Sequence, residues 1–473
     1  MAGGREQFGS KLGFILAAAG SAVGIGNLVG FPVGAAKNGG GAFLVMYALF
    51  VCFICLPVMV AEMTAGRASQ KDPLGAYTSL SGGSCGWRFA GWLSIVTPFM
   101  IAVFYSVITV WIFGYLLESL IGNLDKLAEP ETFGSFITSY SLFAYMVGVL
   151  LIVYFILQGG VKQGIEKAAK ILMPALFIML LALVVFVLTR DNAMAGVTFY
   201  LVPDFSKIDA GVVNGALSQA FFSLSLGMGI MITYGSYIDK KADLPQSAKL
   251  VALTDTAVAF TAGLMILPAI FSFNPSVDTA SLSESSISMI FSYLPQIFLE
   301  MQNSVGYVGA SAIASIFFLL VFFAAITSLV SIFEVPVASL MSEKKVTRRT
   351  SLIICGVLLI VLSVFCALSF GFVEFFTKFM VYAGADKSFF DLVYDVFYDT
   401  ILPLNGLLIC LFVSYRWRKK QFNDEVTLGS KGYKDTWVQK YVDFSLGTFI
   451  PIILAAIFLN TVALKYFGVS IVG

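Results

Sequence analysis

Apolar stretches long enough to cross a lipid bilayer recur along the whole of this sequence. A helix of about 20 residues spans the ~30 Å hydrocarbon core. Of the 473 residues, 58% are hydrophobic and 12% are charged, whereas a typical soluble domain carries about 25% charged residues. The stretches lie at residues 12–33, 43–63, 95–117, 140–157, 171–188, 212–238, 250–273, 308–340, 352–368, 389–415 and 446–464. The sequence therefore predicts an all-α membrane protein with 11 transmembrane helices.

The distribution of positive charge predicts the orientation. When the eleven spans alternate in direction, most of the 29 Lys and Arg residues fall on one side. Loops rich in Lys and Arg stay in the cytoplasm, so we expect a cytoplasmic N-terminus and an external C-terminus. The first apolar run is too long for a cleavable signal peptide and lacks a small-residue cleavage site. We therefore expect a multi-pass protein of the inner (plasma) membrane.

Two predicted spans contain helix-breaking sequence, GSAVGIGNLVGF at residues 20–31 and FFSLSLGMG at residues 221–229. Such backbone is tolerated in a bilayer only where protein or a water-filled cavity encloses it. Its free carbonyls and amides can then hold ions and charged groups of a solute. These spans, the first and the sixth, are five apart and cross in opposite directions. The pattern is typical of a 5+5 inverted-repeat transporter with helices broken at the midplane.

This organisation predicts one transmembrane domain over residues 1–473. The first five-helix repeat would cover about residues 10–190, the second about 212–417, and an extra helix 444–467. The glycines of the first span could also serve packing or nucleotide binding. Gly20 and Gly24 have helix-packing spacing, and Gly24-Ile-Gly26 resembles part of a dinucleotide motif, although no strand precedes it. The second interruption favours the binding of a transported solute.

Ionisable residues inside membrane spans are functional candidates. Glu62 could lie at the interface or accept amide hydrogens freed by the break in the sixth span. Asp255 and Glu334 lie within the seventh and eighth spans. Three aspartates at i, i+4 and i+8 near the outer end of the tenth span could form a solvated vestibule wall; they are Asp391, Asp395 and Asp399.

Polar groups in the spans favour transport over catalysis. The chain has no histidine, which removes the commonest general base, and no nucleophile–base pair stands near the breaks. Hydroxyls such as those of Thr327 and Ser328 usually bond back within their helix, yet they also suit sodium. Tyr105 could be a core aromatic residue or a hydrogen-bond donor to a carboxylate.

Together these features resemble the neurotransmitter:sodium symporters, in particular the bacterial amino-acid transporters related to the leucine transporter. The resemblance covers nearly the whole chain. Its marks are REQFGSKLGFILAAAGSAVGIGN, FPVGAAKNGGGAF, Glu62 with Gly66-Arg67, QAFFSLSLGMGIMITYGSY and FFAAITS. It implies a sodium-coupled amino-acid symporter that works by alternating access, with two sodium ions and no organic cofactor. The implied partners are an amino-acid substrate and the lipid bilayer, without nucleic acid, for a monomer or weak dimer.

The resemblance also implies roles for residues. One sodium site would use Ala22, Asn27, Ser223, Asp255 and the substrate carboxylate. A second would use the carbonyl oxygens of Gly20, Val23 and Ala324 and the hydroxyls of Thr327 and Ser328. The substrate amino and carboxyl groups would lie against Ser21, Ala22, Gly24, Ile25, Gly26, Phe222, Ser223 and Ser225. Tyr105 would hold the carboxylate and Phe222 would cap the pocket. The side-chain pocket would be shaped by Ile25, Ile101, Met228, Ser328 and Ile332.

Gating differs from the family pattern. Cytoplasmic closure would involve Arg5, Phe8 and Tyr237. Most relatives carry an arginine where this chain has Gly30. In those relatives the arginine pairs with an aspartate, and the corresponding position in this chain is Tyr394 or Asp395, depending on the alignment. We therefore expect outer closure to rest on Phe222, Tyr105 and an external hairpin at residues 287–298.

The expected substrate is a medium to large apolar or aromatic amino acid. In chloride-dependent animal relatives the position of Asp255 is neutral and a bound chloride balances the charge, so we expect chloride independence here. Two alternatives stay open. One is a transport-deficient sensor that binds an amino acid, and the other is a proton-coupled transporter of the same architecture.

Overall fold

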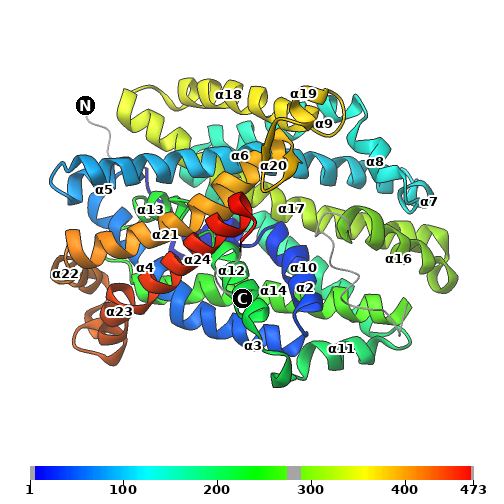
Figure 1. Cartoon of the computed structure of the whole chain (residues 1–473), viewed down its shortest axis with the longest axis horizontal. Helices are drawn as coiled ribbons and strands as arrows, with labels where there is room; N and C mark the ends of the chain where they lie inside the picture. The colour runs from blue at the N-terminus through cyan, green and yellow to red at the C-terminus, as the bar shows by residue number, and fades with distance from the viewer. Residues whose placement is uncertain (1–5, 274–288, 470–473) are drawn as a thin grey trace.

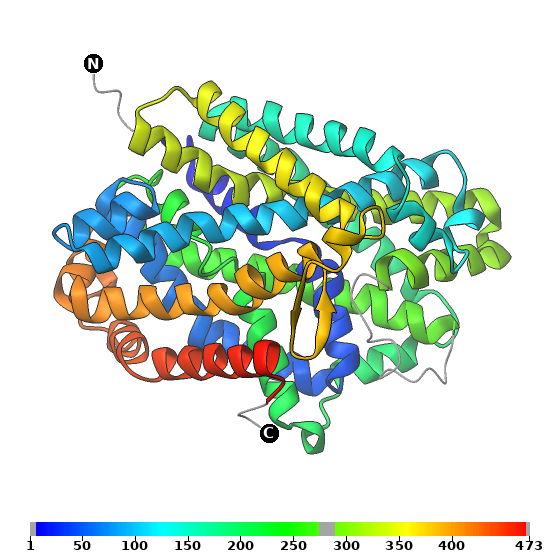
Figure 2. The same cartoon turned by 45° about the horizontal axis from the view of Figure 1, so that its top comes forward.

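The computed structural model describes residues 6–273 and 289–469, where the chain is almost entirely helical. Long helices lie side by side, with one short β-hairpin late in the chain (Figures 1 and 2). Hydrophobic side chains from helices along the whole chain join one continuous core. The all-α class predicted from the sequence is thus what the structure has.

The first part of the chain is a run of α-helices with π-helical segments and a 3-10 turn. Its elements are α1 (Lys11–Ala22), η1 (Gly26–Gly30), α2 (Phe31–Lys37), α3 (Gly41–Phe50), η2 (Val51–Cys55), α4 (Leu56–Ser69), α5 (Pro73–Leu80), α6 (Cys85–Leu120), α7 (Leu124–Leu127), α8 (Thr132–Ile137), α9 (Ser141–Gln158), η3 (Gly160–Glu166), α10 (Lys167–Leu188), α11 (Ala193–Leu201) and η4 (Phe205–Lys207).

The second part also contains the β-hairpin, in which β1 and β2 are antiparallel with Met380 opposite Lys387. Its elements are α12 (Ala210–Ser223), α13 (Ile230–Gly235), α14 (Leu244–Phe273), η6 (Met289–Tyr293), α16 (Leu294–Glu300), α17 (Gln302–Lys344), α18 (Arg348–Leu368), α19 (Glu374–Thr377), β1 (Met380–Tyr382), β2 (Ala385–Lys387), α20 (Phe389–Val393), η7 (Tyr394–Ile401), α21 (Leu402–Leu411), η8 (Phe412–Arg416), α22 (Lys419–Gly429), η9 (Lys431–Tyr433), α23 (Trp437–Gly447) and α24 (Phe449–Phe467).

In the described part of the chain, nine helices are long and apolar enough to cross a membrane, or ten if the bent pair α1 and η1–α2 is one span. These ten coincide with predicted apolar stretches. The remaining stretch, 212–238, is divided into α12 and α13 by the non-helical residues 224–229. The count of eleven spans and the inverted repeat therefore stay predictions.

The first interruption lies between α1 and η1. Helix α1 ends at Ala22 because Val23 has extended φ and ψ angles of -70° and 100°, and the chain bends by 56° before it continues. Glycine permits close approach here. A Cβ at Gly24 would lie 2.8 Å from the Oγ of Ser328 and 2.9 Å from the hydroxyl oxygen of Tyr105.

The second interruption joins α12 to α13. Gly227 has a φ of +76°, a conformation that glycine adopts without strain, and a Cβ there would lie 2.5 Å from the carbonyl oxygen of Leu402. Its N–H donates to Glu62 Oε1 at 2.7 Å, and its carbonyl accepts from Asn405 Nδ2 at 2.9 Å. Glu62 therefore does accept an amide hydrogen freed by this break.

Long continuous helices hold both interruptions. Helices α6 and α17 pack along each other, and α1 lies against α17, α14 and α10. Helix α13 packs against α4 so closely that a Cβ at Gly66 would lie 2.0 Å from the carbonyl oxygen of Ile232, and one at Gly235 would lie 2.4 Å from that of Met63. Small residues are typical of such close helix pairs in membranes.

We expect the substitution Gly66→Ala to destabilise the protein, because the added methyl meets backbone atoms that cannot move aside. Overpacking of this kind costs about 1–3 kcal/mol. The measurement is the melting temperature of the purified protein in detergent. The matched control is Gly356→Ala in α18, where a Cβ has no atom of the described part of the chain within 4 Å. Equal melting temperatures for the two variants would contradict the expectation.

Candidate functional site

Asn27, Ser223 and Asp255 form a buried cluster where the two interruptions meet. The Nδ2 of Asn27 donates to Asp255 Oδ1 at 2.7 Å and to Ser223 Oγ at 2.9 Å. The hydroxyl of Ser223 donates to Asp255 Oδ2 at 2.9 Å. None of the three residues is more than 1% exposed. The structure therefore brings together these three residues of the first predicted sodium site. The fourth predicted residue, Ala22, is the last residue of α1 and precedes Asn27 by five positions in the chain.

Tyr47 of α3 is a fourth member of this cluster that the sequence reasoning missed. Its hydroxyl lies 3.2 Å from both Asp255 Oδ2 and Ser223 Oγ, and its ring packs on that of Phe31. The only signal in the sequence is a tyrosine inside an apolar stretch, since a buried phenol usually finds a hydrogen-bond partner. Asp255 thus receives three side-chain donors, as a buried carboxylate requires.

A second group of oxygen atoms lies where α1 ends beside α17. Ser328 Oγ lies 3.4, 3.1 and 3.2 Å from the carbonyl oxygens of Gly20, Ser21 and Val23. Thr327 Oγ1 is 3.0 Å from the carbonyl oxygen of Ala324. The last carbonyls of a helix lack partners in the helix and carry partial negative charge.

Both groups fit a hard cation, because such ions take oxygen ligands. The first offers the carboxylate and carbonyl of Asp255 and the hydroxyl of Ser223, all within hydrogen-bond distance of the Asn27 amide. The second offers the carbonyl oxygens of Gly20, Ser21 and Val23, at and just after the end of α1, together with the hydroxyl of Ser328.

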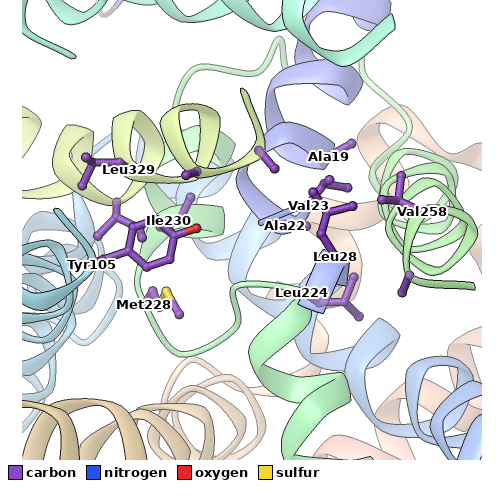
Figure 3. Packing of buried hydrophobic residues seen from close by; sticks show 14 of the residues in the cluster. Ala19, Ala22, Val23, Leu28, Tyr105, Leu224, Met228, Ile230, Val258 and Leu329 are labelled. Carbon is purple, nitrogen blue, oxygen red and sulfur yellow. The ribbon is translucent and has the colours of Figure 1, made fainter. Parts of the chain in front are cut away.

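Tyr105 of α6 points its hydroxyl at the first interruption. Its oxygen accepts a hydrogen bond from the N–H of Ile25 at 3.3 Å. Figure 3 shows the ring between Met228 and Leu329, with the oxygen directed toward Ala22 and Val23. The hydroxyl of Ser225 donates to the carbonyl oxygen of Ser21 at 3.0 Å, which links the two interruptions. Polar groups from both breaks therefore converge here.

Apolar side chains surround this polar region. Ile101, Met228 and Ile332 come from α6, from the second interruption and from α17, and each is at most 3% exposed. Their contact with a substrate stays a prediction.

An open cavity of about 680 Å³, here called the vestibule, reaches the first interruption. Ile25, Gly26, Tyr105 and Phe222 line it. The Phe222 ring covers Gly26, since a Cβ there would lie 2.9 Å from it, and its centroid is 4.3 Å from that of Tyr398. Of the expected external hairpin, residues 287 and 288 lie outside the described residues, and Ile290 lines the vestibule.

Aromatic rings and an ion pair pack around the N-terminal end of α1. The centroid of the Phe8 ring lies 5.6 and 6.2 Å from those of Tyr234 and Tyr237. The backbone N–H of Phe8 donates to the carbonyl oxygen of Tyr237 at 3.2 Å. Phe8 and Tyr237 thus meet, whereas Arg5 lies outside the described residues.

The carboxylate of Glu334 is fully buried in the same region. It accepts from the Tyr237 hydroxyl at 2.8 Å, and the guanidinium of Arg348 donates to both of its oxygens at 2.5 and 3.2 Å. The sequence singled out Glu334 but missed Arg348. A buried carboxylate needs a paired charge, but the sequence does not indicate which cation provides it.

The three aspartates of the tenth predicted span differ in their surroundings. Asp391 Oδ2 accepts from the N–H and hydroxyl of Ser388 and so caps α20. Asp395 and Asp399 both pair with Lys465 of α24, at 2.8 and 2.7 Å. Asp391 and Asp395 do line the vestibule, but Asp395 is not solvated, because it is 4% exposed and ion-paired. Lys465 was not foreseen because nothing in the sequence places α24 against η7.

One solved structure and two sequence relatives are similar to this chain. MhsT in complex with L-phenylalanine superposes with a TM-score of 0.83 at 38% identity, covering 96% of this chain and 99% of that chain. The uncharacterized sodium-dependent transporter YhdH of Bacillus subtilis is 33% identical over 98% of both chains. An uncharacterized sodium-dependent transporter of Methanocaldococcus jannaschii is 30% identical over 96% of this chain and 89% of its own.

The chain also matches the model of a protein family, and the matched residues include the site described above. Residues 5–129 and 134–468 match the sodium:neurotransmitter symporter family, and this match includes both interruptions and both groups of oxygen atoms. The family consists of membrane transporters and not of enzymes. With the bent first helix, the buried oxygen clusters and a match over nearly its whole length, the chain belongs to the sodium:neurotransmitter symporter family.

Proposed function

We propose that this protein is a sodium-coupled symporter that carries a hydrophobic or aromatic amino acid across the plasma membrane by alternating access. The observation that carries this proposal is the pair of oxygen clusters at the helix interruptions. Asn27, Ser223 and Asp255 would hold one sodium ion, and the α1 carbonyls with Thr327 and Ser328 would hold a second. Bound sodium would supply the positive charge that offsets a buried carboxylate.

The same region would receive the amino acid. The hydroxyl of Tyr105 and the amides between Gly24 and Gly26 suit a carboxylate, and the carbonyl oxygens at the two interruptions, such as those of Ser21 and Phe222, suit an ammonium group. The side chain would meet Ile25, Ile101, Met228 and Ile332. Methionine adapts to ligands of different shape. The binding of L-phenylalanine by MhsT supports an aromatic or apolar substrate.

Alternating access requires that the site opens first to one side of the membrane and then to the other. Two groups of contacts would separate in turn during this cycle. On the vestibule side, Phe222 and Tyr398 cover the first interruption. On the other side, Phe8, Tyr237, Glu334 and Arg348 pack around the start of α1. We infer from the charge pattern that the second side faces the cytoplasm, with the N-terminus inside and the C-terminus outside.

The experiment that tests this function is uptake of labelled L-phenylalanine into proteoliposomes. We expect an inward sodium gradient to drive uptake, whereas equal potassium on both sides or a proton gradient alone does not. Leucine, tyrosine and tryptophan should compete, because the predicted pocket wall is apolar. Glutamate and lysine should not.

Each rival function gives a different result in that assay. Binding of L-phenylalanine without uptake or counterflow would indicate the sensor. Uptake driven by protons without sodium would indicate the proton-coupled transporter. Competition by glutamate or lysine that exceeds competition by leucine would contradict the apolar substrate class.

The double substitution Thr327→Val with Ser328→Ala should abolish sodium-driven uptake without loss of folded protein. It removes both side-chain oxygens from the second cluster and leaves the backbone intact. The matched control is Thr109→Val, which removes another buried hydroxyl that bonds back within its own helix, at 2.8 Å from the carbonyl oxygen of Tyr105. Unchanged sodium dependence in the double variant would refute the assignment.

Uptake by the unmodified protein should persist when gluconate replaces chloride, because Asp255 supplies a built-in anion within the first cluster. A unit charge at ~4 Å is worth about 4 kcal/mol at an effective dielectric of ~20, so Asp255→Asn should weaken sodium activation at least about tenfold in chloride-free buffer. Asp391→Asn, which alters a capping aspartate, is the control. Full sodium affinity of Asp255→Asn without chloride, or loss of wild-type uptake in gluconate, would disprove this role.

A further inference from the structure

A lysine in the last turn of α24 bridges two aspartates of η7. Lys465 Nζ lies 2.8 Å from Asp395 Oδ1 and 2.7 Å from Asp399 Oδ2. The three side chains are 36%, 6% and 22% exposed, in that order. Two carboxylates that share one site repel each other unless a cation lies between them. The ammonium group therefore holds this part of η7 against α24.

Further contacts reinforce the same junction. The hydroxyl of Tyr382, on strand β1, donates to Asp395 Oδ2 at 2.7 Å. Burial, with help from Asp395, raises the pKa of Tyr382, so this hydroxyl remains a donor. Next to Lys465, the Tyr466 hydroxyl lies 3.1 Å from Thr400 Oγ1. Figure 2 shows the hairpin beside the C-terminal end of α24. The end of α24, the hairpin and η7 are thus tied together.

This junction is adjacent to the ring that covers the first interruption. Tyr398 lies on η7 between the two aspartates in sequence, and its ring centroid is 4.3 Å from that of Phe222. Segment η7 is π-helical. This form is rare in proteins as a whole, but where it occurs it is often at a functional site. Lys465, Tyr398 and Phe222 line the vestibule, and they also line a second cavity of about 280 Å³.

Gly30, which also lines the vestibule, has no side chain that could form an equivalent bridge. Among the described residues, a Cβ built at Gly30 would meet Gln219 alone, at 3.5 and 3.8 Å. The cation that pairs with Asp395 instead comes from α24.

We propose that Lys465 is a positioning residue of the outer gate. Through Asp395 and Asp399 it fixes η7, so that Tyr398 holds Phe222 over the first interruption. Helix α24 thereby becomes part of outer closure and is not only an appended span. This inference rests on the alternating access proposed above, but not on the identity of the substrate.

The test measures how fast a cysteine on the vestibule wall reacts from outside. The reporter is Gly30→Cys in a protein whose exposed Cys52 and Cys85 are replaced by serine, reconstituted in proteoliposomes with sodium and labelled with a membrane-impermeant maleimide. Lys465→Met should speed labelling about fivefold, because the gate closes less tightly, and a fivefold change corresponds to about 1 kcal/mol. Lys465→Arg should restore the parent rate.

The matched control is Lys37→Met. Lys37 lines the same vestibule and belongs to none of the ion pairs found among the described residues, so this variant makes the same change of charge without breaking the bridge. Its labelling rate should stay within about twofold of the parent. Equal acceleration by Lys37→Met and Lys465→Met would mean a general effect of charge and would overturn the proposal.

A second variant guards against misfolding of Lys465→Met. Asp395→Asn with Asp399→Asn keeps the lysine but removes the bridge, and it should also speed labelling about fivefold. Unchanged labelling in either bridge variant overturns the proposal. Labelling needs no substrate, so failure of L-phenylalanine uptake by the parent protein counts against the proposed function alone.

Discussion

Two non-helical segments inside an apolar bundle, between α1 and η1 and between α12 and α13, expose backbone groups that surrounding lipid could not satisfy. The neighbouring side chains are arranged around this requirement. Glu62 and Asn405 take the amide and carbonyl of Gly227. Gln219 donates to the carbonyl oxygen of Gly26 at 2.9 Å, and the carboxamide oxygen of Asn27 accepts the N–H of Gly24 at 3.0 Å. Without these partners, each unpaired group would cost about 1–3 kcal/mol.

The groups that remain available at the interruptions are those suited to a cation and an amino acid. The C-terminal carbonyls of α1 face Ser328, and Asp255 lies beside Asn27 and Ser223. Stability and the proposed function therefore depend on the same backbone conformation. A residue such as Asn27 both satisfies a freed amide and belongs to the proposed sodium site, so its substitution would affect folding and binding together.

The two ends of the site are built from different chemistry. Around the start of α1, Glu334 and Arg348 form a two-point ion pair within a cluster of aromatic rings. At the vestibule, the ion pairs lie at the junction of η7 and α24, and the ring of Tyr398 on η7 contacts that of Phe222. Gly30 has no side chain, and the proposed outer gate therefore depends on a helix that lies beyond the predicted repeats.

The sequence by itself determined the membrane class, the position of both interruptions and most of the polar residues that meet there. Apolar length and helix-breaking residues act locally, so they can be recognised without a fold. It did not indicate Tyr47 as a donor to Asp255, Arg348 as the partner of Glu334, or Lys465 as the partner of Asp395 and Asp399. Each of these contacts joins elements that are distant in the chain. Only tertiary packing decides which donor or cation reaches a buried carboxylate, because the requirement for a partner is general and several residues could meet it.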